Sequence, residues 1–255
     1  MTIWEAVAVC AAGIGAGALN TVVGTGTLIT FPVLLAVGLP PVTANVSNAL
    51  GLVPGSVSGA IGYRRELRGQ RRRVLLLGGV AFAGAMTGAA LLVALPSSAF
   101  DMIVPALIGV ALLMVAVQPW LTRLAQRRRE KRGTTARTDG GVPLSTGMLF
   151  ASAYGGYFGA AQGIIYLALM GMFLDEDLQR INAVKNVLGA LVNGTAAAFF
   201  LFVADFDWTA VLLIAAGSAV GGQFGALVGR RLPPAALRVI VIAIGTVAII
   251  QQLLR

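Results

Sequence analysis

Long apolar stretches, separated by short polar or basic segments, follow one another along the whole chain. Most are about 20 residues long, which is the length that an α-helix needs to cross the roughly 30 Å hydrocarbon layer of a bilayer. We therefore expect an all-α membrane protein whose helices cross the bilayer many times. Ordinary single crossings are predicted at 42–62, 74–95, 99–121, 181–204, 208–229 and 236–254.

Two apolar stretches, 3–38 and 145–174, are too long for one crossing at about 1.5 Å per residue. Small or polar residues interrupt the first at 20–27 and the second at 155–163. Each stretch is therefore predicted to form a hairpin of two short helices, either re-entrant or spanning as a tight pair. Lipid does not tolerate the exposed backbone at such breaks, so we expect the breaks to be buried in protein or to line a watery cavity.

The charges of the loops predict the orientation of the chain in the membrane. The basic segments 64–73, 123–137 and 230–231 are expected on the cytoplasmic side, and the acidic turn at 205–207 outside. These placements agree with one another only if each long stretch returns to the side from which it came. Both termini are then expected outside.

Composition supports the membrane assignment and excludes several other classes. The chain is 57% hydrophobic and 11% charged, whereas a soluble domain carries about 25% charged residues. Its formal charge of +9 would suggest nucleic acid in a soluble protein, but the arginines lie in short loops, so we expect no nucleic-acid partner. Cys10 is the single cysteine and histidine is absent. We therefore expect no intrachain disulfide, no metal site and no cofactor.

The two halves of the chain resemble each other when one is shifted by about 138 residues. The segment 46–51 then aligns with 184–189, and Gly17 aligns with Gly155. Each half holds one hairpin and three crossings, an odd number, so the second half is predicted to be inverted relative to the first. The predicted parts are a first repeat at 1–121, a basic cytoplasmic linker at 122–143 and a second repeat at 144–255. Inverted repeats with broken helices are typical of secondary transporters with a site near the bilayer midplane. The alternative is a chance alignment of two glycine-rich apolar sequences.

At these motifs the chain resembles the sulfite exporter TauE/SafE family of membrane permeases, over nearly its whole length. The motifs that carry the resemblance are the glycine-rich break at 17–26, Phe31-Pro32, the segments 38–40 and 43–48, the second copy at 180–186, and 225–233. The resemblance implies export or uptake of sulfite, sulfonates or related anions. The chain departs from the glycine-rich pattern with Thr25 and Thr27 in one break and Gln162 in the other.

Lys185 is the sharpest functional signal in the sequence. It is the only basic side chain well inside an apolar stretch, and no acidic residue lies deep in any stretch to pair with it. A charge at that depth costs at least about 2.5 kcal/mol, so it marks a functional candidate. An unpaired cation in such a cavity would attract an anion. The alternative is that Lys185 snorkels to the nearby cytoplasmic surface.

Amide and hydroxyl side chains provide further candidates for binding an anion. Asn48 and Asn186 occupy equivalent positions in the two halves, with Asn45 and Ser47 beside the first and Asn182 one turn before the second. Asn193 and Thr195 follow as weaker candidates. The alternative role for all of them is hydrogen bonding between helices.

The two breaks offer N–H groups and the positive ends of short helices, which favour negative charge. The candidates for substrate binding in the breaks are Asn20, Thr21, Gly24, Thr25, Gly26 and Thr27 in the first and Gln162, Gly163 and Tyr166 in or just after the second. Gly159 could contribute to the second break as well. The alternatives are a packing kink without a ligand and, for Tyr166, a core aromatic.

The sequence thus predicts a permease of the bacterial inner membrane that moves a small anion by alternating access and has no catalytic residues. Its expected partners are the anion and membrane lipid, and it could assemble as a homo-oligomer. A non-transporting membrane assembly factor or receptor subunit is the alternative. An intramembrane protease or metal-dependent enzyme would lack its usual groups, because histidine and buried carboxylates are absent from the pattern.

Overall fold

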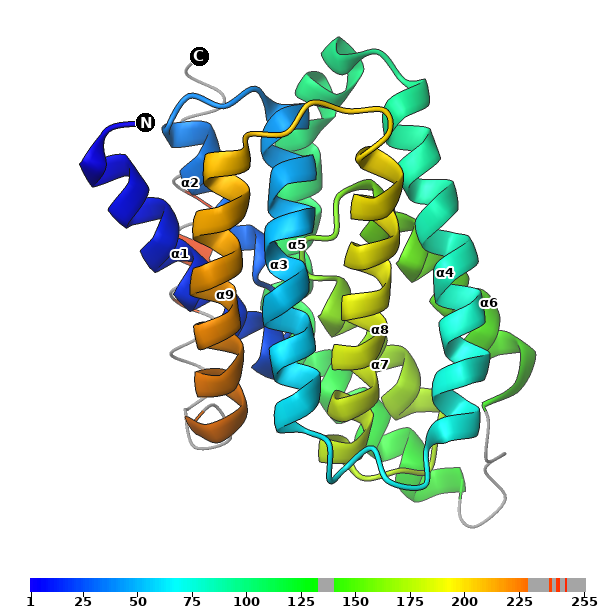
Figure 1. The fold of residues 1–255 in the computed structure, drawn as a ribbon. Helices are drawn as coiled ribbons and strands as arrows, with labels where there is room; N and C mark the ends of the chain where they lie inside the picture. Colours follow the sequence, from blue (N-terminus) through cyan, green and yellow to red (C-terminus); the bar gives the residue numbers. More distant parts are fainter. Residues whose placement is uncertain (133–139, 229–238, 240–241, 244–245, 247–255) are drawn as a thin grey trace.

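The computed structural model describes residues 1–132, 140–228, 239, 242–243 and 246. The elements of this part of the chain are α-helices. They form a bundle of mostly long helices that includes two helical hairpins, α1–α2 and α6–α7 (Figure 1). Their bounds are α1 Ile3–Val22, α2 Thr27–Ala36, α3 Pro41–Gly62, α4 Arg71–Ala94, α5 Ser97–Arg132, α6 Gly141–Tyr157, α7 Gln162–Phe173, α8 Leu178–Phe200 and α9 Trp208–Val228.

The two long apolar stretches form helical hairpins, as predicted. In Figure 1, α1 and α2 enter from one end of the bundle and return to that end, whereas α6 and α7 enter from the opposite end and return there. Each hairpin therefore returns to its own end of the bundle, as the loop charges predict. Their tips meet inside the bundle, where the backbone N–H of Gly163 donates to the carbonyl of Gly24 at 3.2 Å.

Both breaks are shorter than the sequence predicts. The helices stop only over 23–26 and 158–161, and Gly155 and Gly156 remain helical. A Cβ on Gly156 would lie 2.2 Å from the carbonyl oxygen of Ala85 on α4. This glycine therefore permits close packing of two helices and does not interrupt one.

Gly24 is required at the tip of the first hairpin for two reasons. Its φ of +87° lies in the left-handed region, which residues with a Cβ rarely adopt. A Cβ there would also lie 2.3 Å from the Cα of Gly163 in the other tip. The two tips can touch only because both residues lack a side chain.

Five of the described helices, α1, α4, α5, α8 and α9, contain stretches long and apolar enough to cross a membrane, and α2 and α7 are shorter apolar helices. The helix α3 also runs between the two ends of the bundle in Figure 1, but it carries buried polar side chains. These buried polar residues of α3 are Asn45, Ser47, Asn48, Ser56 and Ser58.

The ends of the bundle separate charge as predicted. The basic connection at 63–70 and the basic end of α5 lie at one end, and the acidic turn at 201–207 and the N-terminus lie at the other (Figure 1). The predicted cytoplasmic arginines at 230–231, the crossing at 236–254 and the C-terminus lie outside the described residues, apart from the isolated positions given above. One difference concerns the predicted linker at 122–143, into which α5 continues as far as Arg132. Arginine, glutamate, lysine and glutamine are good helix formers, so the helix outlasts its apolar part.

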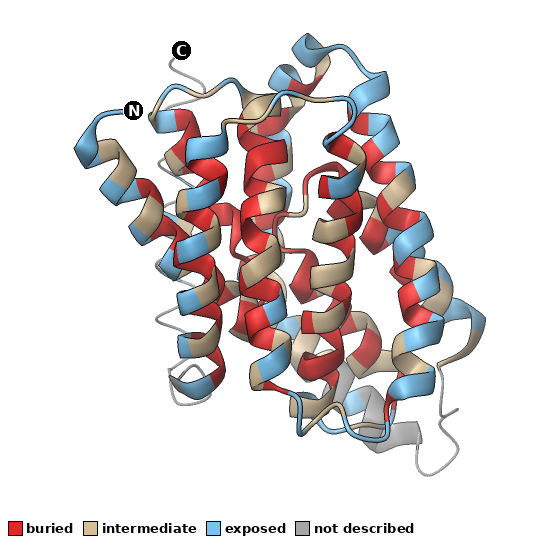
Figure 2. Ribbon diagram, in the orientation of Figure 1, coloured by how far each residue is buried: buried red, intermediate tan, exposed pale blue. Residues whose placement is uncertain are grey.

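Glycines bring two pairs of helices close together. A Cβ on Gly221 of α9 would lie 2.0 Å from the carbonyl oxygen of Ile14 on α1, and one on Gly88 of α4 would lie 1.9 Å from that of Ala153 on α6. Gly217 and Gly225 also face α1, so small residues form a packing ridge on α9. Figure 2 shows the result, a buried interior around the hairpin tips and exposed residues along the outer faces and ends.

Candidate functional site

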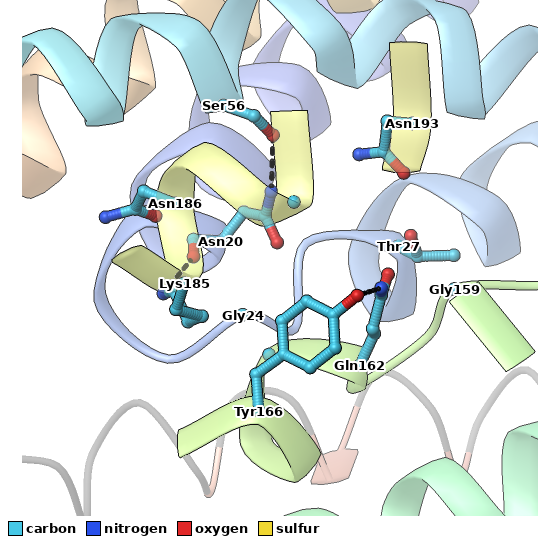
Figure 3. A pocket seen from close by; sticks show the side chains of 12 residues that line it. Asn20, Gly24, Thr27, Ser56, Gly159, Gln162, Tyr166, Lys185, Asn186 and Asn193 are labelled. Atoms are coloured by element: carbon cyan, nitrogen blue, oxygen red, sulfur yellow. Dashed lines mark hydrogen bonds between the residues drawn. The ribbon is translucent and has the colours of Figure 1, made fainter. Parts of the chain in front are cut away.

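A polar pocket lies where the two hairpin tips face α3 and α8 (Figure 3). About 360 Å³ of empty space lies there, a volume that includes open solvent. Its lining residues are Asn20, Gly24, Thr27, Ser56, Gly159, Gln162, Gly163, Tyr166, Lys185, Asn186, Gly189 and Asn193. The pocket thus joins residues that lie far apart in the sequence.

Lys185 lies at the inner edge of this pocket with 2% of its surface exposed. Its ammonium Nζ donates to the backbone carbonyls of Asn20 at 2.8 Å and Thr21 at 3.0 Å. Both carbonyls belong to the last turn of α1, the negative end of that helix, which a cation stabilises. The side chain therefore points to the hairpin tip rather than to the cytoplasmic surface.

The hydrogen-bond partners of the Lys185 ammonium are neutral carbonyl groups. Within the described residues it forms no ion pair with a carboxylate. An ammonium has three N–H donors, and two are used on the α1 carbonyls. The third N–H has no acceptor among the described residues.

Two asparagines of α8 share the Thr21 carbonyl with Lys185. Asn182 and Asn186 each donate to it from Nδ2 at 3.2 Å. Asn186 also lines the pocket, whereas Asn182 does not. The hydroxyl of Thr21 is buried away from the pocket, so the backbone of Thr21, and not its side chain, serves the site.

On the α3 side of the pocket, asparagine amides donate hydrogen bonds to hydroxyl groups. Asn20 donates from Nδ2 to the Oγ of Ser56 at 3.0 Å, a bond drawn in Figure 3. Asn48 donates from Nδ2 to the Oγ1 of Thr27 at 3.2 Å and also pairs with the hydroxyl of Thr30. Asn48 therefore supports Thr27 from outside the pocket.

The second hairpin contributes a chain of hydroxyl and amide groups. Gln162 donates from Nε2 to the hydroxyl of Tyr166 at 2.6 Å, and that hydroxyl lies 2.6 Å from the Oγ of Ser152. Ser152 in turn bonds the carbonyl of Met148. Tyr166 is buried, as a core aromatic would be, but its hydroxyl also faces the pocket (Figure 3).

Other predicted residues lie away from the pocket. Asn45 donates to the carbonyl of Tyr157 at 2.9 Å, at the end of α6. The Ser47 hydroxyl accepts a hydrogen bond from the backbone N–H of Asp207 at 3.0 Å, in the turn before α9. Thr25 and Gly26 are buried within the first break. None of these four residues lines the pocket.

Comparison with known proteins identifies the family of this chain. The profile of the family described as sulfite exporter TauE/SafE matches residues 9–251. The chain belongs to the TauE/SafE family.

Curated relatives of this TauE/SafE chain carry transporter names. The probable membrane transporter protein YfcA of Escherichia coli strain K12 is 26% identical over 82% of this chain and 75% of its own length. A probable membrane transporter protein of Haemophilus influenzae is 27% identical over 84% and 81% of the two chains. A third, ORF9 of a Sinorhizobium species, is 27% identical over 82% and 77%. No solved structure matches this chain.

These matches make the chain a multi-pass bacterial membrane protein of a transporter family. A small-molecule substrate follows from that membership. The predicted family and membrane location are therefore confirmed.

Sequence reasoning on this TauE/SafE chain missed two pocket residues, Ser56 and Gly189. A signal for Ser56 was present, because it follows Asn48 by about two helical turns and Asn45 by about three, so the three share a face of α3. Gly189 carries no side chain to signal a role. Its place in the pocket follows only from the structure, where no atom lies within 4 Å of a Cβ placed on it.

An ionic cluster joins the two halves of this TauE/SafE chain at the basic end of the bundle. Glu176, between α7 and α8, pairs with Arg73 of α4 at 2.9 Å and with Arg180 of α8 at 2.6 Å. Gln70 donates to the carbonyl of Arg180 at 3.1 Å and accepts from Arg73. Burial raises the pKa of Glu176, but the two arginines outweigh burial and lower the pKa below its ordinary value.

The lowered pKa predicts how this cluster responds to pH. A carboxylate whose pKa is lower in the folded state stabilises the fold above its ordinary pKa and loses that contribution as the pH falls through the folded value. We expect Glu176→Gln to lower the melting temperature at pH 7 by about 2–4 °C, the shift for roughly 1 kcal/mol in a chain of this size. The difference from wild type should shrink as the pH falls below 4.5.

Thermal unfolding of the purified protein in detergent between pH 3 and pH 7 measures this effect. Asp101→Asn, at an exposed carboxylate of the opposite end, is the matched control and should change the melting temperature little. A Glu176→Gln difference that stays constant over the whole pH range would contradict the prediction.

Proposed function

We propose that this chain is a secondary transporter, a permease, for small sulfur-containing anions such as sulfite or organosulfonates across the bacterial inner membrane. Alternating access exposes the pocket between the hairpin tips first to one side and then to the other. The observation that carries the proposal is Lys185, a buried cation without a carboxylate partner among the described residues, which lines a polar pocket.

The chemistry of the pocket favours an anion over a cation. Lys185 supplies positive charge, and Gln162 and Asn186 supply amides. No aspartate or glutamate is among the lining residues that the structure describes. A cation site would need carboxylate or clustered carbonyl oxygens, whereas the carbonyls of Asn20 and Thr21 are already occupied by Lys185.

The positive ends of two short helices add to this field. The helices α2 and α7 both begin at the hairpin tips, with Thr27 and Gln162 as their first residues. Both of these residues line the pocket. The negative end of α1, in contrast, is covered by the Lys185 ammonium. The helix dipoles that remain uncompensated at the pocket therefore favour negative charge.

We further propose that 1–121 and 144–255 are inverted repeats joined by the cytoplasmic linker at 122–143. The packing of the helices supports this. Helix α1 packs on α9, and α6, which would correspond to α1, packs on α4, which would correspond to α9. Helices α3 and α8, which would correspond to each other, pack together. An exchange of this kind is expected from a two-fold axis in the membrane plane.

Alternating access requires contacts between the halves that can break and re-form. The Glu176 cluster is such a contact at the cytoplasmic end, because it joins the 63–73 region of the first half to the start of α8 in the second. At the outer end, the Ser47 hydroxyl holds the backbone of Asp207. A movement that opens one end of the pocket would break one set of these bonds and keep the other.

Transport in reconstituted liposomes tests the proposal. Purified protein is inserted into liposomes, and the flux of labelled sulfite, thiosulfate and taurine-derived sulfonates is followed against protein-free liposomes. We expect saturable flux of at least one of these sulfur anions, with the others as competitors. Flux at the protein-free level for every one of them would refute the proposed function and favour a non-transporting role.

A further inference from the structure

Ser56 combines burial, a place in the pocket and an incompletely used hydroxyl. Its surface is 2% exposed, and it lines the pocket from α3. Its Oγ accepts the Nδ2 of Asn20 at 3.0 Å. A serine hydroxyl also has one O–H to donate. In the part of the chain that the structure describes, that O–H has no acceptor.

The hydrogen-bonded pair of Ser56 and Asn20 therefore retains an unused hydrogen-bond donor at the pocket. If the Asn20 amide donates, the Ser56 O–H is free, and the second N–H of the amide is free as well. In this arrangement the Ser56 O–H is not used by Asn20 and can donate to a ligand in the pocket that Ser56 lines.

The backbone of Asn20 connects the Ser56–Asn20 pair to the Lys185 ammonium. The backbone carbonyl of Asn20 accepts the Lys185 ammonium at 2.8 Å, while its side chain holds Ser56. One residue of α1 thus fixes the distance between the cation on α8 and the hydroxyl on α3. Figure 3 shows Asn20 between Ser56 and Lys185 at the pocket.

We propose that Ser56 is a specificity-determining residue that donates a hydrogen bond to an oxygen of the bound anion. The bound species is then an oxyanion with at least two acceptor oxygens, one held by Lys185 and another by Ser56. This inference rests on the proposed function, because it identifies the substrate class of the same pocket. A neutral donor suits this position because it adds binding without adding a charge that would hold the anion too tightly for release.

Binding of sulfite to the purified protein tests this role separately from transport. Ligand-induced stabilisation in detergent gives the dissociation constant for wild type and for Ser56→Ala. We expect Ser56→Ala to weaken sulfite binding roughly tenfold, which corresponds to about 1.4 kcal/mol. Ser58→Ala is the matched control on the same helix, because the Ser58 hydroxyl donates to the carbonyl of Ala219 at 2.7 Å and does not line the pocket.

A double variant separates direct contact from the positioning of Asn20. If Ser56 donates to the anion, Asn20→Ala combined with Ser56→Ala should bind sulfite roughly tenfold more weakly than Asn20→Ala alone. Equal affinities of these two variants would show that Ser56 acts only through Asn20 and would overturn the proposal.

The same series distinguishes failure of this inference from failure of the proposed function. Flux of sulfite with unchanged affinity and KM in Ser56→Ala would overturn the role of Ser56 and leave transport standing. Sulfite binding that Ser56→Ala weakens, without any flux in wild type, would support Ser56 and refute transport. Absence of binding and flux in wild type for sulfite, thiosulfate and the sulfonates alike would overturn both.

Discussion

Replacing Gly189 by leucine should abolish transport while leaving the fold intact. Gly189 lines the pocket on α8, and a Cβ placed on it meets no atom within 4 Å. A leucine therefore has room to extend into the space that the substrate would occupy. Leucine is also a better helix former than glycine by roughly 0.8–1 kcal/mol, so the helix should not be weakened. We expect flux to fall to the level of protein-free liposomes.

Gly194→Leu is the matched control for this blocking variant. Gly194 lies five residues further along α8, has no atom within 4 Å of its Cβ position, and does not line the pocket. Flux near that of wild type is expected. Both variants should elute from gel filtration as wild type does. Wild-type flux in Gly189→Leu would remove this pocket from the transport path, and equal loss in both variants would mean that the effect is not specific to the pocket.

Replacing Lys185 should have the second large effect, because it removes the charge of the pocket. Lys185→Gln keeps an amide donor that can reach toward the carbonyls of Asn20 and Thr21 but carries no charge. Breaking a buried charge pair costs about 3–5 kcal/mol, so sulfite affinity should fall by a hundredfold or more. Lys185→Ala should also lose transport, with the protein still present in the membrane. Ligand-induced stabilisation and liposome flux measure the two effects.

Asn182→Ala shows whether Lys185 acts on the ligand or only on the hairpin. Asn182 donates to the same Thr21 carbonyl as Lys185 but does not line the pocket. Its loss should reduce stability by about 1 kcal/mol, the usual contribution of one hydrogen bond, and change sulfite affinity by about threefold or less. If Asn182→Ala impaired binding as much as Lys185→Gln, Lys185 would be assigned to holding the end of α1.

The outline of the fold could be predicted from the sequence because the surrounding solvent constrains it directly. Apolar runs of the right length located the helices, and runs that were too long located the hairpins. The return of each hairpin to its own side followed from the loop arginines. The exact breaks could not be predicted, because Gly155 and Gly156 look like helix breakers in the sequence but provide helix contact in the structure.

The candidate site could be predicted only in part. Lys185 was identifiable because a charge inside an apolar run is costly. Asn20, Thr27 and Gln162 were identifiable because they lie in the two breaks, and Asn186 because it matches Asn48 in the repeat. The repeat suggested equal roles for Asn48 and Asn186, but only Asn186 faces the pocket. Equivalent positions in two halves can therefore carry different contacts, since each depends on the side chains that surround it.

The sequence by itself determined that this is a multi-pass helical protein with two interrupted hairpins and one deeply placed cation. Hydropathy and charge record the solvent that each segment meets, and they are local properties of the chain. Only the tertiary structure decided that the hairpin tips touch at Gly24 and Gly163, and that Ser56 and Gly189 border the same space as Lys185. Those relations arise from the packing of helices that are distant in the sequence, and no local pattern contains them.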